Sequence, residues 1–178
     1  MQLQDDGVLD LVMATALRDA VRAGESFVVA AGPSRVGKST LANALAQELL
    51  PSVERIYVRG SYETFDFMAE PSAARSALLV NEISPHLPIY LWGSAARRTL
   101  RLAGDGGQLI ATIHADSPQE VVYQLARQPV GATPDEIAAL GAIVFLGPPA
   151  TDAKDPWRVS RIVRLRATAQ GISVEDIA

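Results

Sequence analysis

The chain has 178 residues, of which 48% are hydrophobic and 20% are charged, and its net charge is −4. This composition supplies a substantial core and excludes an intrinsically disordered chain. The acidic balance argues against a protein that coats nucleic acid or an anionic membrane through a net positive field. The sequence contains no cysteine, which excludes disulfides, thiolate nucleophiles and cysteine-bound zinc.

The length predicts a single domain over residues 1–178, with residues 147–178 as a small C-terminal extension that adds a strand. The N-terminus carries Asp5, Asp6 and Asp10 where a signal peptide needs basic charge and then an apolar run. No stretch of the sequence reaches the length of a membrane span. We therefore expect a cytoplasmic protein that is not inserted in a membrane.

The first predicted elements form a helix, a strand and a second helix. Apolar residues recur at helical spacing over 9–20, and Gly24 ends this helix. A short apolar run over 27–31 predicts a strand, and helical spacing resumes over 39–49 until Pro51. The loop between this strand and the second helix is bounded by glycines.

The rest of the chain continues to alternate strands and helices. Residues 61–76 are irregular, with no predicted structure. Two helix starts are well marked, because Ser117 and Thr133 are each followed by Pro and then, at the third position, by Glu. Strands are predicted over 55–58, 77–83, 108–113, 142–146 and 159–165, and a helix over 93–103. This alternation predicts an α/β fold, a mainly parallel sheet with helices on both faces.

The glycine-bounded loop matches the phosphate-binding pattern GxxxxGK[ST], between the strand and the helix that its mechanism requires. Glycines let backbone N–H groups wrap a phosphate, the following helix points its positive dipole end at the anion, and Lys38 can reach the β and γ phosphates. An ordinary glycine turn is the alternative. The nucleotide-binding residues predicted here are Gly32, Pro33, Ser34, Arg35, Val36, Gly37, Lys38, Ser39 and Thr40, with Ser39 also predicted to hold Mg²⁺.

Three further residues are candidates for catalysis. Glu82 ends an apolar strand, where it could orient or deprotonate an attacking water. His114 follows another apolar strand, a position that suits a sensor of the γ-phosphate, although a histidine at a strand end is often structural. Glu63, in the irregular stretch, is a possible water- or metal-orienting carboxylate, although carboxylates in loops are commonly only solvated.

Together these segments resemble the motor ATPases of type II and type IV secretion and of type IV pili, over nearly the whole chain. GPSRVGKST resembles the family's Walker A loop, LLVNEIS its atypical Walker B strand, and GQLIATIHADSPQEVVYQL its His box. The leading helix LDLVMATALRDAVRAG and the closing segments EIAALGAIVFLG and WRVSRIVRL also resemble parts of that domain. The order and spacing of these boxes are more specific than any single one.

The resemblance implies a RecA-like P-loop NTPase fold that binds ATP and Mg²⁺ and forms hexameric homo-oligomers with ATP at the subunit boundaries. It assigns water activation to Glu82, γ-phosphate contact to His114 and Mg²⁺ binding to Ser39. It also implies partners in the secretion or pilus machinery, and a place at the inner face of the membrane that is reached through those partners.

The sequence departs from the expected pattern in three places. The acidic box expected after the second strand is replaced by YVRGSYETF, which keeps at best Glu63, so slow hydrolysis and binding without efficient turnover are both open alternatives. Position 81 is Asn where many P-loop proteins have an Asp that assists Mg²⁺. The first helix begins near Leu9, which leaves no room for the family's N-terminal domain and predicts a lone motor core.

Two other functions fit the same residues. A small-molecule or nucleotide kinase has the same loop but needs an acceptor pocket and an arginine-bearing lid. A nucleotide-responsive binding module would use ATP as an assembly signal, with weak hydrolysis. Arginine can contact phosphate across a subunit boundary, and the candidates for such a contact are Arg55, Arg59, Arg97, Arg98 and Arg101.

Overall fold

The computed structural model describes residues 8–70, 75–149 and 157–177. In chain order the elements are α1 (Leu11–Arg22), β1 (Phe27–Ala30), α2 (Lys38–Gln47), β2 (Arg55–Val58), the 3-10 turns η2 (Gly60–Tyr62) and η3 (Asp66–Ala69), β3 (Ala77–Ile83), α3 (Gly93–Gly104), β4 (Gln108–Ile113), α4 (Pro118–Ala126), α5 (Pro134–Ala138), β5 (Ala142–Gly147), β6 (Arg158–Thr168) and β7 (Gly171–Asp176). Every strand and helix predicted from the sequence is present.

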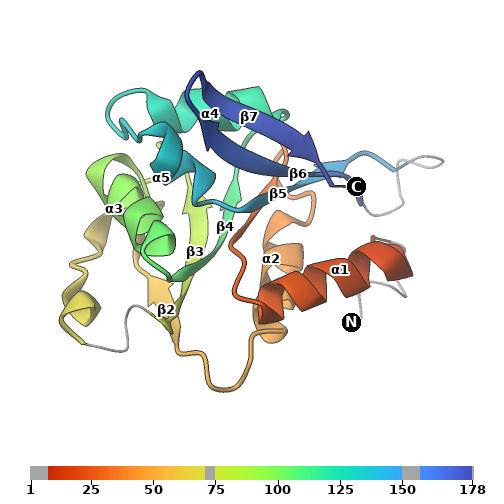
Figure 1. The fold of residues 1–178 in the computed structure, drawn as a ribbon, viewed down its shortest axis with the longest axis horizontal. Coiled ribbons are helices and arrows are strands. Elements are labelled where there is room, and N and C mark those ends of the chain that lie inside the picture. The colour runs from red at the N-terminus through yellow and green to blue at the C-terminus, as the bar shows by residue number, and fades with distance from the viewer. Residues whose placement is uncertain (1–7, 71–74, 150–156, 178) are drawn as a thin grey trace.

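One seven-stranded sheet organises the molecule, with the strand order β2-β3-β4-β1-β5-β6-β7 (Figure 1). The strands from β2 to β5 are parallel to one another, and β6 and β7 extend the sheet with antiparallel pairing. The predicted fold class, an α/β fold with a mainly parallel sheet, is therefore confirmed. Strand β4 lies between β1 and β3, an arrangement on which the geometry of the site depends.

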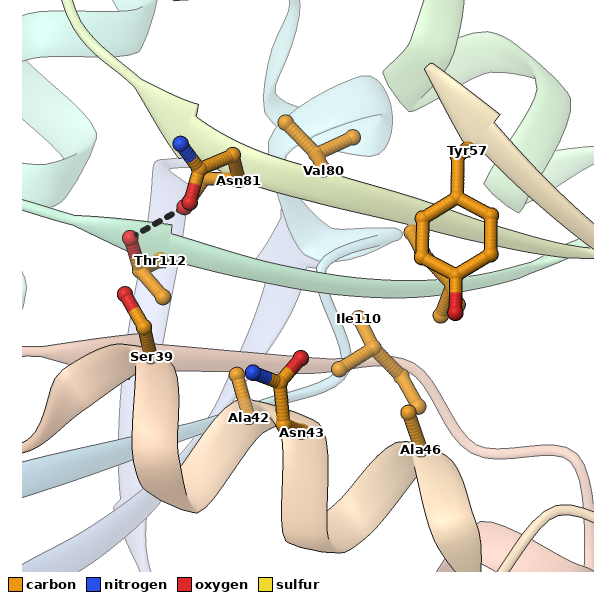
Figure 2. A pocket seen from close by; sticks show the side chains of 10 residues that line it. Ser39, Ala42, Asn43, Ala46, Tyr57, Val80, Asn81, Ile110 and Thr112 are labelled. Carbon is orange, nitrogen blue, oxygen red and sulfur yellow. Dashed lines mark hydrogen bonds between the residues drawn. The ribbon is translucent and has the colours of Figure 1, made fainter.

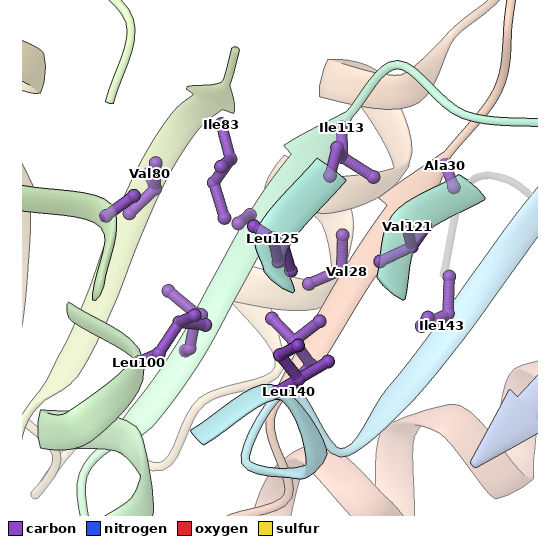
Figure 3. Packing of buried hydrophobic residues seen from close by; sticks show 14 of the residues in the cluster. Val28, Ala30, Val80, Ile83, Leu100, Ile113, Val121, Leu125, Leu140 and Ile143 are labelled. Atoms are coloured by element: carbon purple, nitrogen blue, oxygen red, sulfur yellow. The ribbon is translucent and has the colours of Figure 1, made fainter. Parts of the chain in front are cut away.

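Helices cover both faces of the sheet, and side chains of β1 alternate between them. Phe27 and Val29 pack with α1 and α2, whereas Val28 and Ala30 pack with α3, α4 and α5. Figure 3 shows the second of these layers, in which Leu100, Leu125 and Leu140 lie over the strands. Because successive strand residues point to opposite faces, a strand buried on both faces must be apolar throughout.

The helices begin where capping predicts. Asp10 accepts a hydrogen bond from the N–H of Met13 at 2.7 Å and caps α1. Ser117 caps α4, and Thr133 with Glu136 forms a reciprocal capping box at α5. Gly24 ends α1 with a φ of +87°, a conformation that glycine adopts without strain. None of the helices in the described part of the chain is long and apolar enough to cross a membrane.

The C-terminal part contains one strand more than the sequence analysis predicts. The strand predicted over 159–165 is the longer β6, which turns back through Thr168 and Gly171 into β7. Strand β7 is hard to predict because only Ile172 and Val174 pack on the core. The segment between the predicted strands over 142–146 and 159–165 falls largely on residues 150–156, outside the described residues.

Candidate active site

The phosphate-binding loop connects the end of β1 to the start of α2. Gly37 is the N-cap residue of α2 and has a φ of +101°, so a side chain at this position would be strained. Lys38 begins the ten-residue helix, whose unpaired N–H groups and dipole are directed at the loop. This local geometry is compatible with a phosphate-binding loop, and phosphate binding by these residues stays a prediction.

Lys38 is buried, with 6% of the residue exposed, and its ammonium lies among polar atoms. Nζ donates to the carbonyl of Pro33 at 3.1 Å and lies 3.3 Å from Nδ1 of His114. Burial lowers the pKa of Lys38 below its usual value, although the negative charges of Glu82 and Asp116 raise it in part. A phosphate anion beside Lys38 would relieve this burial cost, because it would add an opposite charge.

Glu82 and His114 meet next to Lys38. Glu82 lies near the end of β3 and His114 directly after β4, and Oε1 of Glu82 is 3.3 Å from Nε2 of His114. Nδ1 of His114 lies 2.9 Å from the carbonyl oxygen of Gly32, which can only accept, and 3.3 Å from the Lys38 ammonium, which can only donate, so the tautomer of His114 decides which contact is a hydrogen bond. Oε1 of Glu82 is buried and has no hydrogen-bond partner among the described residues, since its approach to Nε2 has the distance of an ion pair but not hydrogen-bond geometry.

The strand order explains why residues far apart in sequence meet here. Strand β4 pairs with β1 on one side and with β3 on the other, and all three are parallel. Their carboxyl ends therefore meet at one edge, the place where open α/β sheets bind ligands. The structure brings together Lys38, Glu82 and His114, three residues that the sequence analysis singles out.

Two hollows flank the loop. The smaller, of about 240 Å³, lies between α2 and strands β2, β3 and β4 (Figure 2). Ser39, Asn81 and Thr112 line its polar end, where Oγ1 of Thr112 donates to the carbonyl oxygen of Asn81 at 2.6 Å. The larger, of about 710 Å³, adjoins Pro33 and Ser34 on the other side of the loop and has the size of a nucleotide pocket.

The oxygen atoms near Ser39 are suitable ligands for Mg²⁺. Its hydroxyl lies in the first turn of α2 and lines the same hollow as the carboxamide of Asn81. Mg²⁺ prefers oxygen ligands, and in phosphate-binding sites it is held by one or two protein oxygens together with phosphate and water. Asn81 supplies a neutral oxygen in place of a carboxylate. The oxygens of Ser39 and Asn81 therefore fit Mg²⁺, but they offer it less negative charge than an Asp at position 81 would give.

Glu63 lies directly after η2, and it bonds to backbone groups of described residues on both sides of this turn. Oε2 accepts from the N–H of Arg59 at 2.9 Å, and Oε1 accepts from the N–H of Phe65 at 3.0 Å. Burial raises the pKa of Glu63, but the N–H groups of Arg59 and Phe65 and the charge of Arg59 outweigh it, so the pKa is lowered. Both oxygens thus hold the loop, and its catalytic role stays a prediction.

Two of the arginines that could act across a subunit boundary are paired within the chain. Arg97 and Arg101 of α3 both donate to the carboxylate of Glu136 in α5. Arg98 packs over the ring of Phe65 at 4.7 Å. Arg59 keeps 70% of its side chain exposed, although it also approaches Glu63 at 3.7 Å.

Sequence reasoning missed two residues that adjoin the site. His86, in the loop after β3, places its ring 5.8 Å from that of His114. Asp116 accepts a hydrogen bond from the N–H of Gly32 at 2.7 Å through Oδ1. Its place two residues beyond His114, at the carboxyl edge of the sheet, is the signal that could have identified it.

Neither a protein-family model nor a curated protein matches the chain. Among solved structures, the chain is similar to the VirB11 ATPase of the Brucella suis type IV secretion system, solved in complex with sulphate, with a TM-score of 0.59 and 20% sequence identity. The similarity covers 84% of this chain and 52% of that protein, so the chain spans about half the length of its structural neighbour. The chain therefore has the fold of a secretion ATPase domain, as the resemblance in sequence predicts.

Proposed function

We propose that this chain is a Mg-dependent ATP-binding and ATP-hydrolysing domain of the secretion and pilus motor type. The observation that carries the proposal is the meeting of Lys38, Glu82 and His114 at the phosphate-binding loop. A cation, a carboxylate and a histidine that meet beside a phosphate-binding loop can neutralise phosphate charge, orient the attacking water and contact the γ-phosphate, which are roles that phosphoanhydride hydrolysis uses. The fold of a secretion ATPase supports the same activity.

Each residue has a separate role in the proposed reaction. The N–H groups from Ser34 to Thr40, together with the dipole of α2, bind the phosphates, and Lys38 neutralises charge on the β and γ phosphates. Glu82 accepts the proton of the attacking water, since none of the described residues makes a hydrogen bond to its Oε1 atom that would compete. His114 contacts the γ-phosphate and thereby couples the presence of this phosphate to the position of the residues at the end of β4.

Mg²⁺ would be held by the Ser39 hydroxyl, with the oxygen of Asn81 near it, and it neutralises phosphate charge when it is bound. Ser39 and Asn81 come from α2 and β3, so packing of the helix on the sheet sets the distance between them. The neutral Asn81 predicts weaker metal binding than a carboxylate would give.

We further propose that the domain acts as a homo-oligomer, with a hexamer as the expected form, on the cytoplasmic side of the membrane. The support is the similarity in fold to an ATPase of a type IV secretion system. Proteins of a secretion or pilus machinery are the proposed partners. The exposed Arg59 is the candidate for a contact with a phosphate bound by a neighbouring subunit.

Steady-state release of phosphate from Mg-ATP, measured at several protein concentrations, tests the proposal. Lys38→Ala, purified in parallel, controls for a contaminating ATPase. We expect activity that is lost in the variant and that rises more than proportionally with protein concentration, because neighbouring subunits complete the site. Activity equal to that of the Lys38→Ala protein at every concentration would contradict hydrolysis by this chain alone.

A nucleotide-responsive binding module with weak hydrolysis is the second candidate. The specific observation that favours it is that Glu63, the remnant of the acidic box, uses both oxygens to hold its own loop. Light scattering with and without Mg-ATP tests this function, which requires a change in mass. A kinase is less well supported, since Arg97 and Arg101, which could belong to an arginine-bearing lid, are paired with Glu136 within the chain.

A further inference from the structure

Gly32, the first residue of the phosphate-binding loop, is held through both of its backbone groups by the segment that follows β4. Its N–H donates to Oδ1 of Asp116 at 2.7 Å, and its carbonyl oxygen lies 2.9 Å from Nδ1 of His114. Asp116 lies 84 positions and His114 lies 82 positions from Gly32 in the sequence. The two contacts thus fix the entrance of the loop to the end of β4.

The fit between Gly32 and Asp116 leaves no room for a side chain at position 32. A Cβ atom built on Gly32 would lie 2.1 Å from Oδ2 and 2.4 Å from Cγ of Asp116. The backbone N–H of Asp116 donates to Oε2 of Glu120 at 2.8 Å, which holds Asp116 at the start of α4. The carboxylate therefore approaches the loop from a fixed backbone, and a glycine permits the close approach.

We propose that Asp116 is a positioning residue of the phosphate-binding loop, which it orders for nucleotide through its hydrogen bond to Gly32. The inference rests on the proposed function, because it concerns the affinity of the loop for Mg-ATP. It goes beyond that function, because it proposes that the segment after β4 keeps the loop ordered. The same segment carries the proposed sensor, His114.

The position of Asp116 also explains how the loop stays ordered while the sensor works. If His114 turns toward a γ-phosphate, its Nδ1 atom must leave the carbonyl oxygen of Gly32. The bond from Gly32 to Asp116 does not involve the imidazole, so it holds the entrance of the loop during that change. One residue after β4 is thereby free to respond to the nucleotide, and a second keeps the loop in place.

The carboxylate of Asp116 has a second effect that opposes the first. Its negative charge raises the pKa of Lys38, which favours the ammonium form, but the same charge repels a triphosphate at the loop. Asparagine at position 116 would keep an acceptor oxygen and remove the charge, whereas alanine would remove both. The two variants therefore separate positioning of the loop from electrostatics.

The experiment measures the Kd of a fluorescent ATP analogue with Mg²⁺ for the full chain and for Asp116→Asn, Asp116→Ala, Gly32→Ala and the double variant Gly32→Ala/Asp116→Ala. Asp105→Ala, which changes an exposed Asp after α3, is the matched control. We expect Asp116→Ala to raise Kd by about tenfold, the effect of one lost charge-assisted hydrogen bond. Asp116→Asn is expected to bind as tightly as the parent chain or more tightly.

Gly32→Ala is expected to raise Kd as much as Asp116→Ala does, because the added Cβ displaces the carboxylate. The double variant should then bind no more weakly than either single variant, since both changes remove the same bond. For Asp116→Ala the loss should lie in Kd rather than in kcat at saturating nucleotide, which separates loop ordering from chemistry. A Kd for Asp116→Asn as high as that for Asp116→Ala, or losses that add in the double variant, would overturn the proposal.

Failure of the proposed function has a different signature. If the parent chain does not bind the analogue, the nucleotide assignment is wrong, and the link between Gly32 and Asp116 is judged from unfolding by urea without nucleotide. The parent chain, Gly32→Ala, Asp116→Ala and the double variant then form a cycle in the free energy of unfolding. Non-additive losses at positions 32 and 116 would support the link, and additive losses would refute it.

Discussion

Replacing Glu82 with glutamine tests the chemistry of the site most directly. The two side chains have nearly the same shape, and Glu82 is 8% exposed, so packing around β3 should be preserved. Glutamine cannot accept a proton from water. Because Oε1 of Glu82 is buried and has no hydrogen-bond partner among the described residues, the carboxylate is free to act as a base, and its loss should affect turnover rather than folding.

The expected magnitude follows from this role. A positioned general base contributes about 10²- to 10⁴-fold to the rate, or about 3–5 kcal/mol of barrier. We expect kcat of Glu82→Gln to fall within that range, while Kd for Mg-ATP stays within about threefold of the parent value, because Lys38 and the loop remain. Removing the charge of Glu82 also removes a cause that raises the pKa of Lys38, so nucleotide binding should weaken at a lower pH than in the parent chain.

The assay combines phosphate release at saturating Mg-ATP with titration of a fluorescent ATP analogue between pH 7 and about 10, a range that lies below the usual pKa of lysine and in the direction in which burial lowers the pKa of Lys38. Glu70→Gln, at an exposed position, serves as the matched control. A kcat for Glu82→Gln within about threefold of the parent value would refute the assignment of Glu82 as the base. A parallel loss of turnover and of binding would instead mean that Glu82 holds the loop.

Further measurements address the other residues. Glu63→Gln should destabilise the loop after η2 by about 1–2 kcal/mol, since the oxygens of Glu63 accept two backbone N–H bonds. It should lower kcat far less than Glu82→Gln does. Equal losses of kcat in the two variants would restore Glu63 to the catalytic machinery. Burial raises the pKa of Glu136, but Arg101, Thr133 and Arg97 outweigh it and hold the pKa at about 2. The stabilisation that ionised Glu136 provides is therefore complete above the ordinary pKa of 4.5 and disappears as the pH falls toward 2. The difference in unfolding free energy between the parent chain and Glu136→Gln should close over that pH window. A constant difference would contradict the ion pairs. Leu100→Ala, at a fully buried position in α3, should cost about 2–5 kcal/mol in urea unfolding, and a cost below about 1 kcal/mol would contradict the packing described.

The sequence was sufficient for most of the fold because its local signals agree with one another. The apolar runs of β1, β3, β4 and β5 are buried on both faces, as a parallel sheet between two layers of helices requires. Ser117 and Thr133 cap helices at the positions that the sequence marks. Strand β7 escaped prediction because it lies at the sheet edge and half of its residues are exposed.

The candidate site was predictable in part, for a topological reason. The ends of apolar strands identify Glu82 and His114, because parallel strands bring their carboxyl ends to one edge. Pairings across the chain have no local signal. The bond from Gly32 to Asp116 and the pairing of Arg97 and Arg101 with Glu136 depend on how distant segments pack, and so only the structure reveals them.

The central position of β1 has a consequence for folding. Its two neighbours are β4 and β5, and the paired residues Phe27 and Ile110, or Phe27 and Ala142, are far apart along the chain. Closing loops of this length costs entropy before any contact is gained, so the strand that leads into the phosphate-binding loop is completed late. Competence to bind a nucleotide would then report that the whole sheet has assembled, and a nucleotide present during refolding would stabilise only the finished chain.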